Sequence, residues 1–403
     1  MYLFLLGRDK TLSKLEIAVY LHKHNISYSV IVNSEKYLIL DFNKEHNFEK
    51  STKELGGLVR VSKVYLETSK IKSNREIINK LDFNNPKKFN YTISTIDVSE
   101  EEIDVVEDLL KQEFKEERVK AVYKKPITHS KKKSKEGINY IANPDNYFSW
   151  KINEGLELFV VKSNNKFYFA KTISCFNPKD NIFKDKNRPV IKEMYNTSFR
   201  LVSIMINLLG LSKGKTIVDP FCGTGTFLIE GLIKNYNVIG IDNSKEMIEA
   251  SNKNVSWAIK EFKLSGRGYK IMQGNSAKTK FSADACVFEP YMGPFLKKAL
   301  NLEKAKTIVK ELNGIYYDVF LNLNSNLPKK ARVVCILPDF KTYDNKVISI
   351  DRRVYERNGF SLVDVSSLNP KLELQNPIAY TTPSGSKINR KIYILEKNKG
   401  DEI

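Results

Sequence analysis

The nine residues from Val218 to Thr226, Val-Asp-Pro-Phe-Cys-Gly-Thr-Gly-Thr, constrain the fold more than any other part of this sequence. Apolar residues before Asp219 predict a buried parallel strand, and Phe227 to Glu230 predict the start of a helix. A glycine-containing turn between a strand and a helix is where open α/β sheets bind nucleotide-like ligands, because glycine lets the backbone approach the ligand. We therefore expect an α/β fold with a cofactor site at this turn. A tight turn without a ligand is the alternative.

Two common nucleotide-binding turns do not fit this stretch. A phosphate-binding P-loop needs Gly-Lys followed by Ser or Thr, which Thr226 and Phe227 do not supply. The dinucleotide fingerprint needs a third glycine three residues after Gly225, where this chain has Leu228. The cofactor is therefore of another kind.

The stretch Asp-Pro-Phe-Cys-Gly-Thr-Gly-Thr resembles motif I of the S-adenosylmethionine-dependent methyltransferases that modify exocyclic amines of nucleic-acid bases. The resemblance implies S-adenosyl-L-methionine as the cofactor, with the loop wrapped around its methionine end. The cofactor contacts that it implies in this stretch are Asp219, Pro220, Phe221, Gly223, Gly225 and Thr226.

Two more strands predict the rest of the cofactor site. The strand from Val238 to Asp242 ends in a carboxylate that can accept both ribose hydroxyl hydrogens. The alternative role for Asp242 is capping the next helix, although Asn243 or Ser244 can do this instead. After a third strand, from Tyr269 to Gly274, the resemblance implies contacts from Asn275, beside the adenine amino group, and from Ser276.

The segment Phe288-Glu289-Pro290-Tyr291 is the predicted catalytic site. An exocyclic amine is a poor nucleophile because its lone pair is delocalised into the ring. Acceptors aimed at the N–H groups stabilise the charge that develops on transfer, and the Glu289 carboxylate with a carbonyl held by Pro290 supplies them. Tyr291 would stack on a base swung out of its helix, which is worth roughly 1–3 kcal/mol per stack.

This segment departs from the usual pattern of such amino-methyltransferases, which is Asp, Asn or Ser followed by Pro-Pro and an aromatic residue. Here Glu289 precedes a single proline. Glu289 is either a longer acceptor arm or part of a loop that has lost catalysis. The form Glu-Pro-Tyr followed by Gly-Pro resembles a divergent branch of the same RNA methyltransferase family.

Composition excludes several classes of protein. The chain has 403 residues, 41% of them hydrophobic, which is enough for two or three domains with buried cores. No stretch approaches 18 uninterrupted apolar residues, and the first six residues are too short for a signal-peptide core, so we expect no membrane span and a cytoplasmic protein. Four scattered cysteines and four histidines without metal-ligand spacing predict no metal site and no disulfide framework.

The chain is strongly basic, with 66 basic and 47 acidic residues and a net charge of +19. This excess favours a polyanionic partner, although a lysine-rich proteome is an alternative source of it. The basic residues gather locally in a hydroxyl-rich stretch that suits phosphate contacts, with a solvated loop as the alternative. The predicted RNA-binding residues are Lys124, Lys125, Lys131, Lys132 and Lys133.

The first half of the chain is predicted to alternate short strands and helices, and its sequence contains no recognisable set of catalytic residues. We expect a helix at 47–55, an amphipathic helix at 103–114 and a hairpin formed by 158–161 and 167–170. The short motifs Leu6-Gly7-Arg8 and Glu54-Leu55-Gly56-Gly57 resemble the N-terminal portion of THUMP-containing tRNA methyltransferases.

In the second half of the chain we expect a helix from Phe295 to about Leu323 and a terminal antiparallel pair of strands in a seven-stranded, mostly parallel sheet.

Taken together, the chain resembles the THUMP-containing tRNA guanosine N2-methyltransferases that modify guanosine 10. The resemblance implies a tRNA substrate, with no partner protein or a small activating one. A DNA or other RNA amino-methyltransferase, and a non-catalytic tRNA-binding protein with the same fold, are the alternatives. The predicted domains are an N-terminal ferredoxin-like α/β domain at 1–70, a THUMP-like RNA-binding domain at 71–172, a linker at 173–199 and a Rossmann-like S-adenosylmethionine-dependent methyltransferase domain at 200–398.

Overall fold

The computed structural model describes residues 1–72, 76–81, 88–124, 133–134, 137–141, 155–192, 197–296, 298–380 and 388–398. The chain divides into two compact units. The first unit comprises Met1–Gly7, Ser27–Glu54 and Leu58–Asp180, and the second comprises Arg8–Ile26, Leu55–Gly57 and Asn181–Ile403. These units are defined by contacts and combine segments that are distant in the sequence. They therefore do not test the domain boundaries at 70, 172 and 199, which stay a prediction.

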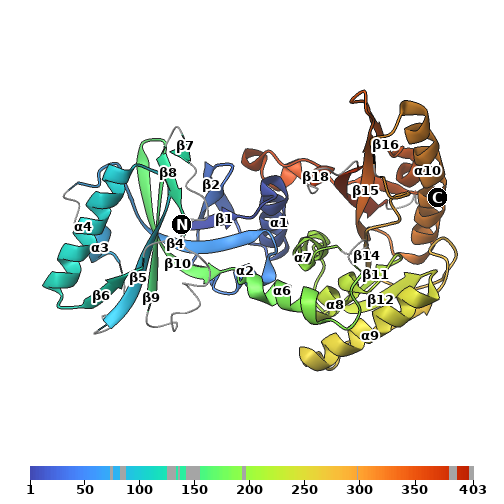
Figure 1. The fold of residues 1–403 in the computed structure, drawn as a ribbon, viewed down its shortest axis with the longest axis horizontal. Helices are drawn as coiled ribbons and strands as arrows, with labels where there is room; N and C mark the ends of the chain where they lie inside the picture. Colours follow the sequence, from blue (N-terminus) through green and yellow to red (C-terminus); the bar gives the residue numbers. More distant parts are fainter. Residues whose placement is uncertain are drawn as a thin grey trace. The chain divides into compact units, whose positions relative to one another are not determined.

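The first unit is built on one mixed sheet of ten strands in the described part of the chain (Figure 1). Its order is β2-β3-β1-β4-β10-β9-β5-β8-β7, and β6 pairs with β5. The strands are β1 (Tyr2–Leu6), β2 (Tyr28–Asn33), β3 (Tyr37–Phe42), β4 (Leu58–Thr68), β5 (Lys88–Val98), β6 (Lys120–Tyr123), β7 (Lys133–Ser134), β8 (Gly137–Tyr140), β9 (Gly155–Ser163) and β10 (Lys166–Cys175). The antiparallel pair β9–β10 confirms the predicted hairpin.

Three helices lie wholly within the first unit in the described part of the chain, and the longest shows why its sequence folds this way. They are α2 (Ser51–Glu54), α3 (Glu76–Asn79) and α4 (Glu100–Glu116). Ser99 and Glu102 cap the start of α4 reciprocally, each side chain accepting a hydrogen bond from the other residue's backbone N–H. Val106, Leu110 and Phe114 then form one apolar face that is buried in the core over the sheet. The amphipathic helix predicted at 103–114 is therefore confirmed.

The second unit contains a sheet of nine strands within the described residues. Its order is β13-β12-β11-β14-β15-β19-β17, with β16 paired to β15 and β18 paired to β19. The strands are β11 (Thr216–Asp219), β12 (Asn237–Asp242), β13 (Tyr269–Gln273), β14 (Ala285–Phe288), β15 (Arg332–Lys341), β16 (Val347–Ser349), β17 (Phe360–Leu362), β18 (Ile378–Tyr380) and β19 (Ile388–Lys397). Strands β11 to β15 pair in parallel and β19 runs antiparallel to both neighbours, which confirms the predicted reversed terminal strand.

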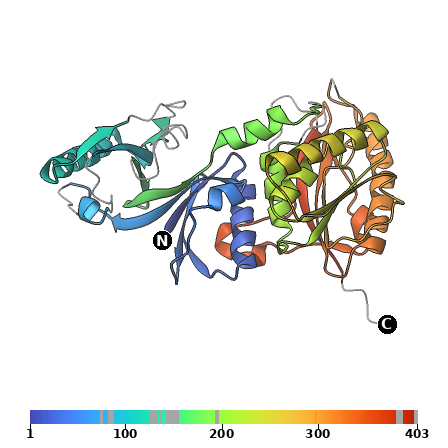
Figure 2. The same cartoon turned by 90° about the horizontal axis from the view of Figure 1, so that it is seen from below.

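Helices cover both faces of this second sheet (Figures 1 and 2). Those of the unit are α1 (Lys10–Lys23), α6 (Pro178–Asn187, which begins in the first unit), α7 (Phe199–Leu208), α8 (Thr226–Ile233), α9 (Lys245–Glu261), α10 (Leu302–Asn326) and α11 (Arg353–Glu356). Helices α7, α8 and α9 pack in sequence along one face, and α10 with α11 covers the other. The carboxyl ends of the parallel strands are thereby left at one edge between two helical layers, where ligands of such sheets bind.

Three predicted segments differ from the structure. Residues 178–187 of the expected linker form helix α6, which we did not predict. The helix predicted from Phe295 begins only at Leu302, where Asn301 accepts a hydrogen bond from the N–H of Lys304 and caps it. The helix predicted at 47–55 is a single turn, α2. The cap at Asn301 explains the later start of α10.

In the part of the chain that the structure describes, no helix is both long enough and apolar enough to cross a membrane. The four cysteines all lie in described residues, where they are buried and form no disulfide.

Candidate active site

Asp219 stands at the carboxyl end of β11 and is fully enclosed. Its Oδ1 accepts a hydrogen bond from the N–H of Phe221, 2.9 Å away, which bends the chain into the turn. Its Oδ2 is buried and has no hydrogen-bond partner among the described residues. Burial raises the pKa of Asp219 well above its usual value, and the carboxylates of Asp242 and Glu289 add to the shift. A buried, unpaired acceptor of this kind suits a ligand that brings a hydrogen-bond donor.

The turn after Asp219 requires glycine at two positions for different reasons. Gly225 has a φ of +86° and caps the start of α8, and a Cβ there would lie 2.6 Å from Oγ of Ser251. Gly223 has a φ of +49°, but the nearest atom to a Cβ there would be the carbonyl oxygen of Phe221, 4.0 Å away. The space beside Gly223 is open, so a ligand can approach the backbone at this residue.

Asp242 joins the turn to the neighbouring strand. The N–H of Gly223 donates to its Oδ2 at 3.0 Å, and the N–H of Ser244 donates to its Oδ1 at 2.9 Å. Each carboxylate oxygen keeps a second lone pair, so ribose hydroxyls can still donate to it. The side chain of Ser244 accepts from Met247 and caps α9, which confirms that Asp242 is not needed as the cap.

The loop after β13 brings the remaining predicted cofactor residues to the same edge. The Ser276 hydroxyl donates to the carbonyl of Pro220, so this loop contacts the glycine turn directly. The carboxamide oxygen of Asn275 accepts from the N–H of Ala277 at 2.8 Å and shapes its own turn. The side chain of Asn243 is exposed beside Asp242. Their contacts with a cofactor stay predictions.

Glu289 follows β14, which pairs in parallel with β11, so its carboxylate lies at the same edge of the sheet as Asp219. Two side chains hold it. The hydroxyl of Thr197 donates to Oε2, and Nη1 of Arg390 lies 3.4 Å from Oε1. Sequence reasoning missed Thr197 and Arg390, because neither belongs to a motif and both are distant in the sequence. They fix the carboxylate in one orientation.

The residues after Glu289 present an aromatic ring on a fixed backbone. Pro290 is buried, whereas the side chain of Tyr291 is 53% exposed. The hydroxyl of Tyr316 donates to the carbonyl of Tyr291 at 2.6 Å and anchors it to α10. Gly293 completes the loop with a φ of +90°. An exposed ring on an anchored backbone can stack on a flat ligand at little entropic cost.

Two predicted cofactor residues have side chains engaged inside the protein. The ring of Phe221 packs against Phe288, with the centroids 5.7 Å apart. The hydroxyl of Thr226 accepts a hydrogen bond from Nη1 of Arg188, 2.9 Å away. Sequence reasoning also missed Arg188, although a basic residue before a proline ahead of the glycine turn was visible in the sequence.

The predicted RNA-binding lysines fall largely outside the described residues. Lys125, Lys131 and Lys132 lie outside them, and Lys133 belongs to β7 without a described side chain. Lys124 is exposed and continues from β6 with its N–H bonded to the carbonyl of Tyr91 at 2.8 Å. Contact of these lysines with RNA stays a prediction.

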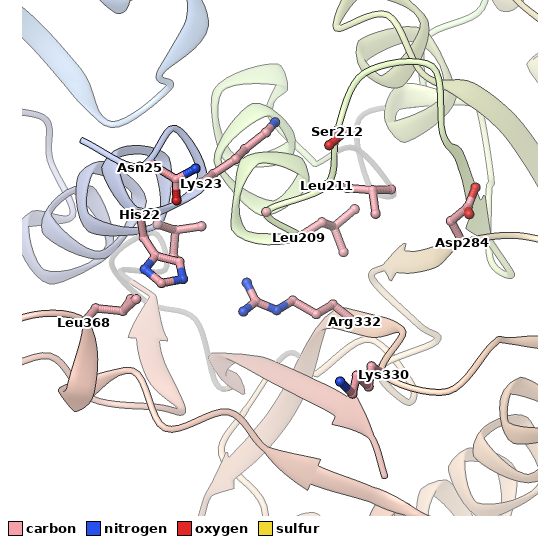
Figure 3. Close-up of a pocket in the computed structure, with 12 residues that line it drawn as sticks. His22, Lys23, Asn25, Leu209, Leu211, Ser212, Asp284, Lys330, Arg332 and Leu368 are labelled. Atoms are coloured by element: carbon pink, nitrogen blue, oxygen red, sulfur yellow. The ribbon is translucent and has the colours of Figure 1, made fainter. Parts of the chain in front are cut away.

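A cavity of about 430 Å³ lies at the opposite edge of the second sheet, beside the amino ends of β11, β14 and β15 (Figure 3). Basic side chains dominate its polar lining: His22, Lys23, Lys330 and Arg332. Its acid, Asp284, lies 3.1 Å from the ammonium of Lys215. None of the predicted site residues lines this cavity, so it is separate from the candidate active site. Among the described residues, no group of three or more His, Cys, Asp or Glu is arranged to hold a metal ion.

Comparison with known proteins agrees with this geometry. Residues 197–276 match the family described as RMKL-like, methyltransferase domain. With the strand order of the second sheet, the match defines this unit as an S-adenosylmethionine-dependent methyltransferase domain of the Rossmann-like class. A probable tRNA (guanine(10)-N2)-dimethyltransferase from Methanothermococcus thermolithotrophicus is 35% identical over 143 residues, which are 34% of this chain and 77% of that protein. The chain belongs to the tRNA guanine N2-methyltransferase family.

Two other relatives match longer stretches of this chain at lower sequence identity. A tRNA (guanine(10)-N2)-dimethyltransferase from Methanocaldococcus jannaschii is 26% identical over 211 residues, 49% of this chain and 57% of that protein. The enzyme of that name from Methanothermobacter thermautotrophicus is 26% identical over 166 residues, 40% of this chain and 44% of that protein. The chain thus spans about half the length of these two relatives. The crystal structure of TrmN from Thermus thermophilus shares the fold, with a TM-score of 0.52 at 12% identity over 98% of this chain and 99% of that one.

Proposed function

We propose that this protein transfers a methyl group from S-adenosylmethionine to the exocyclic N2 of a guanosine in tRNA, at position 10. The observation that carries the proposal is the position of the Glu289 carboxylate. It lies at the carboxyl edge of the methyltransferase sheet, one strand from Asp219 and held by two side chains. The names of the family relatives supply the base and the position.

The site residues fit the cofactor in three respects. Asp219 offers a buried acceptor without a partner, Gly223 leaves open space beside the backbone, and Asp242 keeps lone pairs for two hydroxyls. The acceptor on Asp219 suits an ammonium group, the space beside Gly223 suits close approach of the ligand to the backbone, and the lone pairs of Asp242 suit the two ribose hydroxyls. When bound, the cofactor supplies an activated methyl group.

The remaining chemistry belongs to the protein's own side chains. The Glu289 carboxylate accepts hydrogen bonds from the guanine amino group and stabilises the positive charge that develops on nitrogen. Tyr291 stacks on the extruded base and offsets part of the few kcal/mol that extrusion costs. Pro290, which is buried, limits the backbone conformations of this loop.

The first unit supplies tRNA binding in this proposal, with a THUMP-like module at 71–172 and the lysines at 124, 125 and 131–133. The net charge of +19 supports a polyanionic substrate. Replacing Lys131, Lys132 and Lys133 with alanine should weaken tRNA binding and flatten its dependence on salt. Cytoplasmic location and action with no partner, or with one small activating protein, complete the proposal.

The test is methyl transfer from tritiated S-adenosylmethionine to unmodified tRNA, with labelled nucleosides identified by mass spectrometry. We expect label in N2-methylguanosine, and none when position 10 carries inosine, which lacks the amino group. Glu289→Gln should lower the single-turnover rate by about 10²–10³-fold while cofactor affinity stays unchanged. Glu303→Gln, an exposed change on α10, is the matched control.

Other outcomes would redirect the proposal. Label in another nucleoside would contradict the base assignment. Labelling of DNA in place of tRNA would favour a DNA amino-methyltransferase. Intact tRNA binding without any label would favour a non-catalytic protein in which Thr197 and Arg390 keep Glu289 engaged.

A further inference from the structure

Arg188, just after α6, is a buried cation whose hydrogen bonds are mostly unmade. It is 2% exposed, and its Nη1 donates to Oγ1 of Thr226. Its Nε and Nη2 have no hydrogen-bond partner among the described residues. Oδ1 of Asp185 forms an ion pair with Nη2 at 4.0 Å, which is beyond hydrogen-bond distance, so this oxygen is also left without a hydrogen bond among the described residues. A guanidinium rarely stays buried with open donors, because the lost hydration is not replaced.

The other described groups near Arg188 do not accept a hydrogen bond from Nε or Nη2. The nearby carboxylate of Glu230 is engaged by Lys184, with Oε2 and Nζ 2.8 Å apart. The guanidinium carbon of Arg188 lies 5.5 Å from the centroid of the Phe199 ring. This cation–π contact covers one face of the guanidinium but gives its N–H groups no hydrogen-bond acceptor. Among the described residues, Nε and Nη2 of Arg188 therefore keep donors that an anionic ligand can use.

The position of Arg188 is fixed against the glycine turn. The next residues along the chain are tied down by Asn254, whose Oδ1 accepts from the N–H of Val190 at 2.8 Å. The same carboxamide donates to the carbonyl of Thr224, within the turn, at 2.9 Å. Thr226, which holds Arg188, is the first residue of α8. Arg188 thus lies beside the amino end of this helix, where free N–H groups already favour an anion.

The two ends of the turn are complementary. Where β11 enters the turn, Asp219 has a buried oxygen with no donor among the described residues. Where the turn enters α8, Arg188, which is bonded to Thr226, has buried N–H groups with no acceptor among them. An α-amino acid group carries the matching pair, an ammonium and a carboxylate, on one carbon atom. We propose that Arg188 binds the α-carboxylate in the methionine part of S-adenosylmethionine. This inference rests on the proposed function and adds a binding residue from outside the glycine motif.

The test compares two ligands that differ only in this carboxylate. Isothermal calorimetry without tRNA measures the affinity of wild type, Arg188→Met and Arg188→Lys for S-adenosylmethionine and for its decarboxylated form. Wild type should prefer the carboxylate by about 30-fold or more, since a buried charged hydrogen-bonded pair is worth 2 kcal/mol or more. Arg188→Met should lose that preference while its affinity for the decarboxylated ligand changes by less than about threefold. Arg188→Lys should keep part of the preference, because it keeps the charge.

The matched control is Lys186→Met, which removes an exposed cation from the last turn of α6, two residues before Arg188, and should behave as wild type. Equal loss of affinity for both ligands in Arg188→Met would overturn the inference and leave Arg188 as a structural link between α6 and α8. If wild type itself does not distinguish the two ligands, the inference fails without any variant. If wild type binds neither ligand, the proposed cofactor is wrong as well. This outcome differs from the previous one, in which both ligands bind equally and only the role of Arg188 is wrong.

Discussion

The hydroxyl of Thr197 donates a hydrogen bond to Oε2 of Glu289 across 92 residues of sequence. Thr197 is 8% exposed and stands just before α7, where Ser198 caps the helix. The amino end of α7 is thereby attached to the loop that carries the proposed catalytic acceptor. Because Arg390 approaches the other oxygen, the carboxylate cannot rotate without breaking one contact.

Thr197 should therefore act as a positioning residue. Thr197→Val keeps the shape but removes the donor, and we expect kcat to fall by about 10–100-fold, the range for a hydrogen bond to a charged group. The KM for S-adenosylmethionine should stay unchanged, because the hydroxyl is bonded to Glu289 and not to a residue proposed to bind the cofactor. Thr197→Ser should restore the rate. Steady-state kinetics on tRNA check this, and a serine variant as slow as valine would show that packing matters instead.

Gly225 should be sensitive because of one neighbouring atom. In Gly225→Ala the new Cβ would lie 2.6 Å from Oγ of Ser251, with a φ that alanine rarely adopts. We expect a lower Tm and weaker cofactor binding. The double variant Gly225→Ala/Ser251→Ala should recover part of the Tm, because it removes the clash and leaves only the backbone strain.

Gly223→Ala is the matched control for that experiment, because a Cβ there meets open space in the described structure. It should cost less stability than Gly225→Ala. Thermal unfolding and calorimetry separate the two effects. An equal Tm for the single and double Gly225 variants would mean that contact with Ser251 is not the cause.

Asp219 should make stability depend on pH. Its pKa is raised in the folded state by burial, so the folded chain holds this proton to a higher pH than the unfolded chain. Above the unfolded value of about 4, the folded state binds more protons, and the free energy of unfolding falls as pH rises. This contribution is fully present below pH 4 and is lost as the pH rises through the raised pKa of the folded state.

Asp219→Asn should remove that part of the slope and raise the stability of the ligand-free protein at pH 8 relative to wild type. It should also weaken cofactor binding, because the amide replaces the buried carboxylate proposed to accept a hydrogen bond from the ligand. Urea unfolding at pH 5 and pH 8 measures the slope, with Asp318→Asn, an exposed change on α10, as the control. A slope that persists in Asp219→Asn would assign it to other groups.

Arg60 and Glu157 form a buried ion pair in the first unit, with Nε and Oε2 3.0 Å apart and both side chains inaccessible. The hydroxyl of Ser94 donates to the other carboxylate oxygen at 2.6 Å. Glu157→Ala leaves the buried Arg60 cation without its carboxylate and should cost about 3–5 kcal/mol, whereas Arg60→Met/Glu157→Leu should cost much less. Urea unfolding checks this, with Lys63→Ala in an exposed pair as the control. Equal losses in the single and double variants would mean that lost packing dominates.

Contiguous features were predictable from sequence. The order of strand, glycine turn and helix around Gly225, the acid that ends β12 and the antiparallel pair of β17 and β19 all follow from local periodicity or a short motif. The helix at 178–187 was missed because its polar composition is typical of a linker. Its stabilising contacts are tertiary: Lys184 pairs with Glu230, and the Phe183 ring lies 6.3 Å from that of Trp257.

The sequence by itself determined the class of fold and the position of the cofactor turn, because backbone conformation and hydrophobic period are written in neighbouring residues. Only the tertiary structure decided which side chains surround Glu289 and Arg188. Their partners come from distant segments, and a hydrogen bond or an unmet donor depends on positions to within about an ångström. Oδ2 of Asp219 and Nε and Nη2 of Arg188 lack hydrogen bonds within the described structure because folding removes water from both ends of the same turn.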